Sequence, residues 1–164
     1  MEEGTAVFRE MIRKNRQLSE EECIEILKNE KRGVISVLGD DDYPYGTPMN
    51  HFYNEEDGNV YFHCGNIGHR LEALRRHDKA SFCAFDEGVR QDGDWALTIR
   101  SVIVLGRIEI IDDMDTIADI TTKLSRKFTD DEAYIQKEVK DHGKRTLLLK
   151  LSVEHMCRKK VHEA

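Results

Sequence analysis

The junction between a predicted strand and a predicted helix carries the residues best suited to bind an anion. Gly65 and Gly68 precede a helical pattern that begins near His69, and Arg70 lies in its first turn. That turn presents free backbone N–H groups and the positive end of the helix dipole, so a cation there is unfavourable unless an anion binds beside it. Phosphate fits best, because a guanidinium binds it through paired hydrogen bonds. The alternative is a solvated amphipathic helix that begins at a glycine.

A second candidate feature is a strand with an internal proline. Pro44 and Pro48 are the only prolines of the chain, and Pro48 falls inside the predicted strand 45–53. Proline has no N–H for a sheet ladder, so this strand lies at an edge or faces a partner other than a strand. A flat ligand with donor and acceptor edges is one such partner, and Gly46 permits its close approach. A plain edge strand is the alternative.

Two further pairs of residues are candidates. Arg100 and Ser101 open a long predicted strand and could reach the same anion across a barrel, or form an exposed strand end. Of the seven histidines, His51 and His63 lie on strands predicted to pair, so their rings could converge. Two histidines without a third ligand do not make a metal site, and no spacing indicates a nucleophile. We therefore predict no metal, and ordinary hydrogen-bonded histidines remain the alternative.

The composition limits the class of protein and its partners. The 164 residues suit one domain, and no interior stretch rich in Gly, Pro or Ser divides them. Lys and Arg number 25 against 32 Asp and Glu, a net charge of −7, which excludes general nucleic-acid and anionic-membrane binders. No apolar run approaches the ~20 residues of a membrane span. The acidic start 1–4 lacks signal-peptide features, so a cytoplasmic protein with free thiols is expected.

Helical patterns are expected in five places along the chain. Residues 1–18 are predicted to form an N-terminal arm, in which Val7, Phe8, Met11 and Ile12 share one helical face. Ser19 and Glu22 form a capping box, which predicts a helix to about Lys31 that Gly33 ends. Further helical patterns cover residues 69–77, 114–127 and 131–141.

The remaining patterns indicate strands, at residues 34–38, 45–53, 59–64, 79–85, 96–111 and 146–153, with a polar loop over 86–94. The hairpin signal Asp57-Gly58 makes the strands 45–53 and 59–64 antiparallel neighbours. Gly106, inside the longest strand, indicates a bulge or bend of the kind that turns barrel corners. The sequence therefore predicts an α+β, mainly β fold, in which an antiparallel sheet curls into a barrel with flanking helices.

Several ordered blocks of the sequence resemble one known family. The blocks are RKNR (13–16), GVISV (33–37), YPYGTPMN (43–50), YFHCG (61–65), GHRL (68–71) and RSVIVLG (100–106). Together they resemble the pyridoxamine-phosphate-oxidase-like flavoproteins, and among these most the Nim-type branch, named for nitroimidazole resistance. The resemblance covers residues 13–111, and a weaker resemblance is present at the C-terminus. It implies a split β-barrel and a homodimer with FMN in a groove at the subunit interface.

The resemblance also implies roles for particular residues. The strand 47–50 would lie along the isoalloxazine ring, and the junction 63–71 would hold the phosphate. Arg70 stands where the family carries Lys or Arg, and Arg100 and Ser101 would approach the cofactor from the long strand. The residues expected to bind the cofactor are Thr47, Pro48, Met49, Asn50, His51, His63, Cys64, Gly68, His69, Arg70, Leu71, Arg100 and Ser101.

Two segments depart from the family pattern. Cys64-Gly65 replaces the commoner Ser-Ala pair, which alters the pocket without abolishing it. The segment 156–159 has lost the Thr and Gly of the usual Thr-Gly-Lys but keeps Lys159. Of the residues that the family pattern places here, the C-terminal segment therefore retains only Lys159.

The function implied is an FMN-dependent oxidoreductase. NADH or NADPH would reduce the flavin, and a small acceptor would take the electrons; only the resemblance suggests a nitroaromatic acceptor. His51 and His63 are candidates for lining the substrate side, and Trp95 for an aromatic lid. The alternative is a non-catalytic module that binds flavin, deazaflavin or haem. Haem would require a histidine such as His51 to face the groove as an axial ligand.

Overall fold

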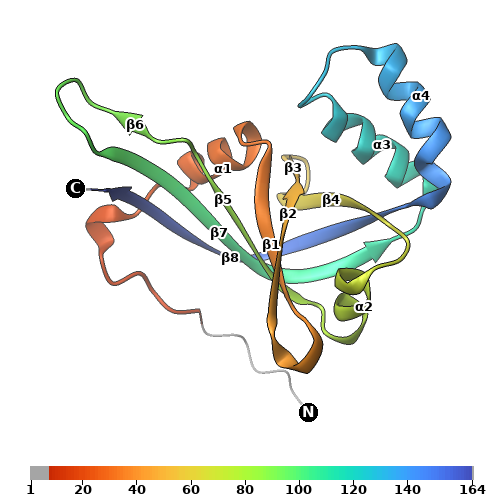
Figure 1. The fold of residues 1–164 in the computed structure, drawn as a ribbon, viewed down its shortest axis with the longest axis horizontal. Coiled ribbons are helices and arrows are strands. Elements are labelled where there is room, and N and C mark those ends of the chain that lie inside the picture. The colour runs from red at the N-terminus through yellow and green to blue at the C-terminus, as the bar shows by residue number, and fades with distance from the viewer. Residues whose placement is uncertain (1–7, 164) are drawn as a thin grey trace.

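The structure is a computed structural model that describes residues 8–163 (Figure 1). Its α-helices are α1 (Glu20–Asn29), α2 (His69–Arg76), α3 (Met114–Ser125) and α4 (Glu132–His142). Its strands are β1 (Arg32–Leu38), β2 (Pro44–Asn50), β3 (Phe52–Asn54), β4 (Asn59–Gly65), β5 (Lys79–Phe85), β6 (Val89–Arg90), β7 (Leu97–Ile111) and β8 (Thr146–His162). Short 3-10 helices cover Lys14–Arg16, Asp40–Asp42 and Gly143–Arg145.

The strands form one antiparallel sheet in the order β2-β1-β5-β7-β8-β4-β3, with β6 paired to β7. The two longest strands, β7 and β8, pair along most of their length and cross the middle of the molecule (Figure 1). The sheet curls into a half-barrel, and α2 and the pair α3–α4 lie toward one end of it. This arrangement confirms the predicted α+β split barrel with flanking helices.

The pairing of the two longest strands contains a β-bulge. The pairing between β7 and β8 shifts register between Leu105 and Gly106, where the sequence predicts a bulge. A Cβ atom at Gly106 would collide with the backbone carbonyl of Ser152, so only glycine permits this close crossing.

The main core lies inside the half-barrel. Phe62 of β4 and Phe82 of β5 are fully buried, and their rings pack edge to face with centroids 4.9 Å apart. Ile26 and Leu27 of α1 cover the same core. A smaller cluster forms on the outer face of the sheet, where Tyr61 packs with residues of α3. Among residues 8–163, no helix is long and apolar enough to cross a membrane.

Two predicted boundaries are wrong. The capping box of Ser19 and Glu22 does start α1, but the helix ends at Asn29, well before Gly33. Gly33 instead lies in β1, where a Cβ atom would collide with the ring of Phe82. The strand predicted over 45–53 is broken at His51 into β2 and β3. As a result β2 pairs with β1, and only the short β3 pairs with β4.

The two ends of the chain also differ from expectation. The last strand, β8, continues past the predicted end at residue 153 to His162, and its distal half pairs with the start of β7. In the N-terminal arm, residues 8–13 are not helical, and only Lys14–Arg16 form a 3-10 turn. Val7 lies outside the described residues. Inside the predicted loop 86–94, the two-residue strand β6 pairs with β7.

Candidate functional site

The junction between β4 and α2 forms a small open pocket. Gly68 is the N-cap of α2 and adopts φ +136°, a conformation that glycine tolerates, with no atom within 4 Å of the position of a Cβ. No side chain of the described part of the chain caps this helix end, so its first N–H groups remain available to a ligand. The pocket has a volume of about 190 Å³ and is lined by Tyr45, Cys64, Gly65, Ile67, Gly68, His69, Arg70 and Leu71.

Arg70 joins this pocket to the edge strand β2. Its Nη1 donates a hydrogen bond of 2.8 Å to Oγ1 of Thr47. Among residues 8–163, no carboxylate lies within ion-pair distance of Arg70, so its positive charge is not neutralised. Burial raises the pKa of the Cys64 thiol, and the nearby Arg70 offsets only part of that effect. The pocket therefore contains an uncompensated guanidinium beside a neutral thiol and a hydroxyl.

The turn between β1 and β2 is held against α2. The ring of His69 packs on Tyr45 with centroids 4.3 Å apart, and its Nε2 lies 3.5 Å from a carboxylate oxygen of Asp40. Arg76 donates to the other oxygen of Asp40 at 2.6 Å. These contacts fix the position of β2 relative to the start of α2. Tyr45 and Asp40 were not among the predicted site residues, and no local sequence signal identifies them.

Two unpaired strand edges approach each other beside this pocket. Among the described strands, β2 pairs only with β1 and therefore ends the sheet, as Pro48 predicted. β3 covers only the first part of β4, so residues 62–65 pair with β8 on one side and, within residues 8–163, have no strand on the other. Because β2 and β4 approach across this gap, backbone donors and acceptors from both strands are available to a flat ligand.

His51 is not part of this pocket. Its side chain is fully buried, its Nε2 lies 2.8 Å from the carbonyl oxygen of Leu27, and its ring packs on Phe82. Burial, together with the charge of Lys127, lowers the pKa of His51 to about 3, so the ring is neutral at physiological pH. The expectation that His51 lines a substrate groove or ligates haem does not fit this position, because core side chains enclose the ring.

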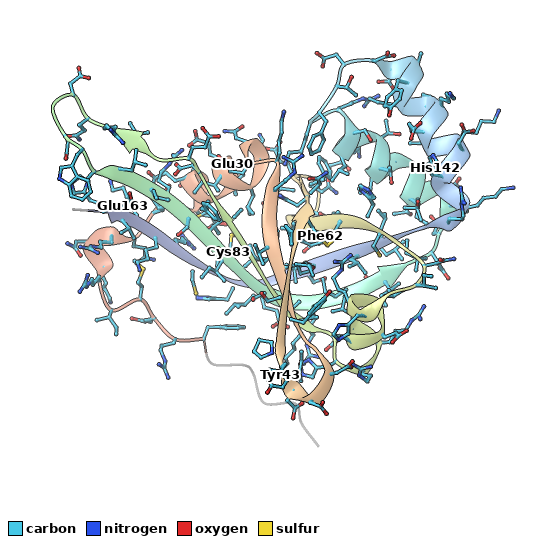
Figure 2. All side chains as sticks on the ribbon, viewed as in Figure 1. Glu30, Tyr43, Phe62, Cys83, His142 and Glu163 are labelled. Atoms are coloured by element: carbon cyan, nitrogen blue, oxygen red, sulfur yellow. The ribbon has the colours of Figure 1, made fainter. Side chains whose placement is uncertain are left out.

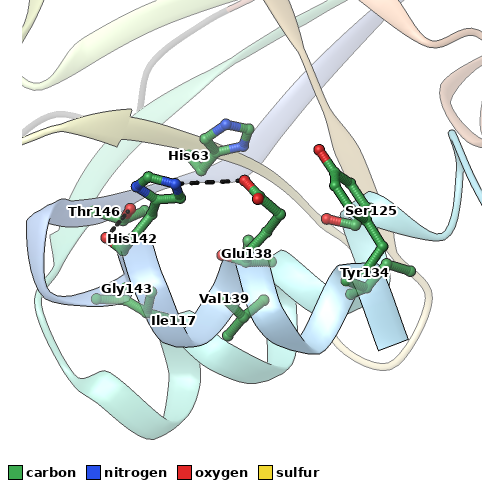
Figure 3. Close-up of a pocket in the computed structure, with 11 residues that line it drawn as sticks. His63, Ile117, Ser125, Tyr134, Glu138, Val139, His142, Gly143 and Thr146 are labelled. Carbon is green, nitrogen blue, oxygen red and sulfur yellow. Dashed lines mark hydrogen bonds and ion pairs between the residues drawn. The ribbon is translucent and has the colours of Figure 1, made fainter. Parts of the chain in front are cut away.

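His63 also lies away from Arg70. Successive residues of a strand point to opposite faces of the sheet, and Cys64 packs toward the core of the half-barrel. His63 therefore points to the outer face, where it lines a different pocket against α3 and α4 (Figure 3). The convergence that the sequence left open for these two histidines is therefore not found, and the sheet separates them.

Arg100 and Ser101 lie toward the far end of the sheet. Arg100 donates to Asp86 through Nε at 2.8 Å and to Glu25 through Nη1 at 3.2 Å. Burial alone would raise the pKa of Asp86, but the hydrogen bonds from Arg100 outweigh it and lower the pKa. Ser101 donates to the carbonyl of Lys159 at 3.5 Å. Within one chain the structure does not bring these residues to Arg70.

A basic groove lies beside Ser101. It runs between the N-terminal arm and the distal part of β8 and has a volume of about 830 Å³. Its basic residues are Arg9, Arg13, Lys14, Arg16, Arg158 and Lys159. Lys14 pairs with Glu10, whereas Arg9, Arg13, Arg16 and Lys159 have no carboxylate partner within the described part of the chain. The run 13–16 was noted in the sequence, but the contribution of β8 depends on the fold.

Comparisons with known proteins identify the fold of the chain. The sequence model for pyridoxamine 5′-phosphate oxidase matches residues 19–160. Among curated proteins, none matches the sequence. A conserved hypothetical protein from Mycobacterium tuberculosis has a similar structure, with a TM-score of 0.76 and 18% identity over 90% of this chain and 88% of that one.

Two other solved structures share the fold. A putative 5-nitroimidazole antibiotic resistance protein from Bacteroides thetaiotaomicron superposes with a TM-score of 0.70 at 20% identity, covering 88% of this chain and 84% of that one. A FAD and heme binding protein from Mycobacterium smegmatis gives 0.67 at 18% identity, covering 89% and 72%. At these identities the likeness concerns the fold alone.

Proposed function

The chain belongs to the pyridoxamine 5′-phosphate oxidase family, and we propose that it is an FMN-dependent oxidoreductase. In this proposal Arg70 and the N-terminus of α2 hold the flavin phosphate. NADH or NADPH supplies the electrons, and a small organic molecule accepts them. The name of the nitroimidazole resistance protein that shares the fold makes a nitroaromatic compound the first acceptor to test.

One observation carries the proposal: Arg70 lies at an uncapped helix N-terminus with no carboxylate to neutralise it among residues 8–163. A helix N-terminus and a guanidinium both favour a phosphate dianion, and their combination is costly without one. The hydroxyl of Thr47 orients the guanidinium from β2. The residues present therefore fit a phosphate monoester better than a neutral ligand.

The two open strand edges suit the ring system of a flavin. An isoalloxazine has hydrogen-bond donors and acceptors along one edge, and residues 47–50 of β2 and 62–65 of β4 offer unpaired backbone groups. When bound, FMN supplies the hydride and electron chemistry, and the protein supplies binding, orientation and electrostatics. Flavin is favoured over haem because His51 is enclosed in the core.

We also propose that two copies of the chain form the complete site. Thr146, which pairs with Gly65, and His155 of the basic groove are nine positions apart on β8, which is roughly 30 Å of extended strand. In one chain the groove and the phosphate pocket therefore lie toward different ends of β8. A symmetric dimer can place the groove and Ser101 of one copy against the phosphate pocket of the other.

The test begins with cofactor binding by the purified full chain. The protein is expected to bind FMN about a hundredfold more tightly than riboflavin, because riboflavin lacks the phosphate that Arg70 binds. A titration with FAD distinguishes a mononucleotide site from a dinucleotide site. Equal affinities for FMN and riboflavin would overturn the phosphate assignment. The mass in solution should be that of a dimer, and a monomer that still binds FMN contradicts the shared site.

The second stage tests catalysis. Anaerobic addition of NADH or NADPH is expected to bleach the flavin absorption bands, and a 5-nitroimidazole is expected to restore them. Absence of bleaching with both nicotinamides, in protein that retains FMN, would leave a flavin-binding module without this activity.

A further inference from the structure

A second pocket lies on the outer face of β4, outside the proposed flavin site. It is lined mainly by residues of α3 and α4 and by His63, and has a volume of about 310 Å³ (Figure 3). Figure 2 places His142 on the helical pair, away from Tyr43 of the turn that is held against α2. Because His63 and Cys64 point to opposite faces of β4, the sheet separates this pocket from Arg70.

The pocket has an apolar floor and a polar rim. Ile117 of α3 and Ile135 of α4 are buried at its base. Thr121 also lines the pocket, and its Oγ1 is buried without a hydrogen-bond partner among residues 8–163. A buried hydroxyl without a partner is unfavourable, so rotation of this side chain toward a ligand in the pocket would remove that cost.

The rim presents a carboxylate to the interior. Figure 3 shows Glu138 with His142 on one side and Ser125 and Tyr134 on the other. Nε2 of His142 lies 3.5 Å from Oε2 of Glu138, while Nη2 of Arg145 lies 3.5 Å from Nδ1 on the far side of the ring. A ring whose Nδ1 accepts from Arg145 directs an N–H at Nε2 toward the carboxylate of Glu138. His142 therefore positions this carboxylate at the rim.

His63 completes the rim on the side of β4. Part of its ring remains open to solvent, yet the surrounding pocket walls bury enough of it to lower its pKa. A neutral imidazole adds a hydrogen-bonding group without adding a positive charge. The pocket therefore combines one carboxylate, several other polar groups and an apolar floor.

We infer that this pocket binds a small planar cation, or a single-ring compound rich in N–H donors. The ring would rest on the apolar floor, and its charged or N–H-bearing edge would face Glu138 and the hydroxyl of Thr121. A volume of about 310 Å³ is at the low end for small-molecule sites and suits one ring with a substituent. This site is additional to the proposed flavin site and does not depend on it.

Calorimetric titration of the full chain with benzamidine tests the inference, since benzamidine is a single-ring planar cation. Benzamide and benzoate are its neutral and anionic counterparts of similar shape. Benzamidine is expected to bind at one saturable site, more tightly than benzamide, and benzoate is expected not to bind. Glu138→Gln keeps the shape of the side chain and is expected to weaken benzamidine binding about tenfold or more, because a charge-assisted hydrogen bond is lost.

Asp141→Asn is the matched control, since Asp141 is an exposed carboxylate on the same helix that does not line the pocket. This variant should bind benzamidine like the unmodified protein. Three results would each overturn the inference: no saturable binding of benzamidine at millimolar concentration, equal binding of benzoate, or unchanged affinity in Glu138→Gln. The FMN titration is independent of these results, so failure here leaves the proposed function untouched.

Discussion

Arg70 and Arg100 are the two arginines that the sequence marks as anion ligands, and their surroundings differ. Arg70 donates to the neutral hydroxyl of Thr47 and, among residues 8–163, has no acidic partner. Arg100 donates to two carboxylates, those of Asp86 and Glu25. The same residue type thus retains its charge for a ligand in one place and is neutralised within the fold in the other.

The comparison shows that the electrostatics of the neighbours, rather than the residue type, decides which cation can bind a ligand. A guanidinium between two carboxylates has satisfied most of its hydrogen bonds, so an added anion must compete with them. A guanidinium held by one hydroxyl still has donors available for a phosphate. In this chain Arg70 is therefore expected to act in binding, and Arg100 in tying the start of β7 to the loop after β5 and to α1.

Charge reversal at the two positions gives the largest expected effects. Arg70→Glu should weaken FMN binding by about a hundredfold or more, roughly 3 kcal/mol, because a carboxylate would face the phosphate. Its melting temperature should change little. Arg100→Glu should lower the melting temperature instead, because three carboxylates would then meet.

Fluorescence titration with FMN and thermal unfolding of the apoprotein measure the two quantities separately. The assignment of ligand binding to Arg70 alone would be wrong if Arg100→Glu lost FMN affinity as strongly as Arg70→Glu. In that case Arg100 would leave its acidic partners and contribute to a site formed with a second copy.

The pH dependence of the free energy of unfolding tests the ion pair between Arg100 and Asp86. The pKa of Asp86 is lowered in the folded state. Its contribution to stability is therefore present above the pKa of an unfolded aspartate, near 4, and is lost as the pH falls through the lower folded value. Asp86→Asn should cost about 1 kcal/mol at pH 7, and the difference from the unmodified protein should shrink below pH 4.

Urea unfolding over a pH series measures this effect. Asp92→Asn is the control, because Asp92 is an exposed carboxylate in the same loop. A difference between Asp86→Asn and the unmodified protein that stays constant down to pH 2 would show that the ion pair with Arg100 is not its source.

Features set by neighbouring residues could be predicted from the sequence. The capping box starts α1 because Ser19 and Glu22 exchange hydrogen bonds of 2.7 and 3.2 Å over one turn. Pro48 requires an edge strand because it lacks an N–H, and β2 does end the sheet. The bulge at Gly106 likewise follows from the absence of a side chain where β7 and β8 cross.

Features set by distant residues could not be predicted in this way. Glu25 is 75 positions from Arg100, and no local pattern indicates that the two meet. The sequence pattern places His51 within a strand, but the break between β2 and β3 places it beneath α1. The distal part of β8 escaped detection because its basic side chains line the groove beside the N-terminal arm, which removes the expected apolar alternation.

The smallest expected effect concerns the residue that orients Arg70. Thr47→Val keeps the shape of the side chain but removes the oxygen to which Arg70 donates at 2.8 Å. The guanidinium can still reach a phosphate, but it must first be ordered without this partner. FMN affinity is therefore expected to fall by only about threefold, or ~0.7 kcal/mol. Thr47→Ser keeps a hydroxyl and should restore the affinity. An equal loss in both variants would assign the effect to packing of β2 and would leave Arg70 without a positioning partner.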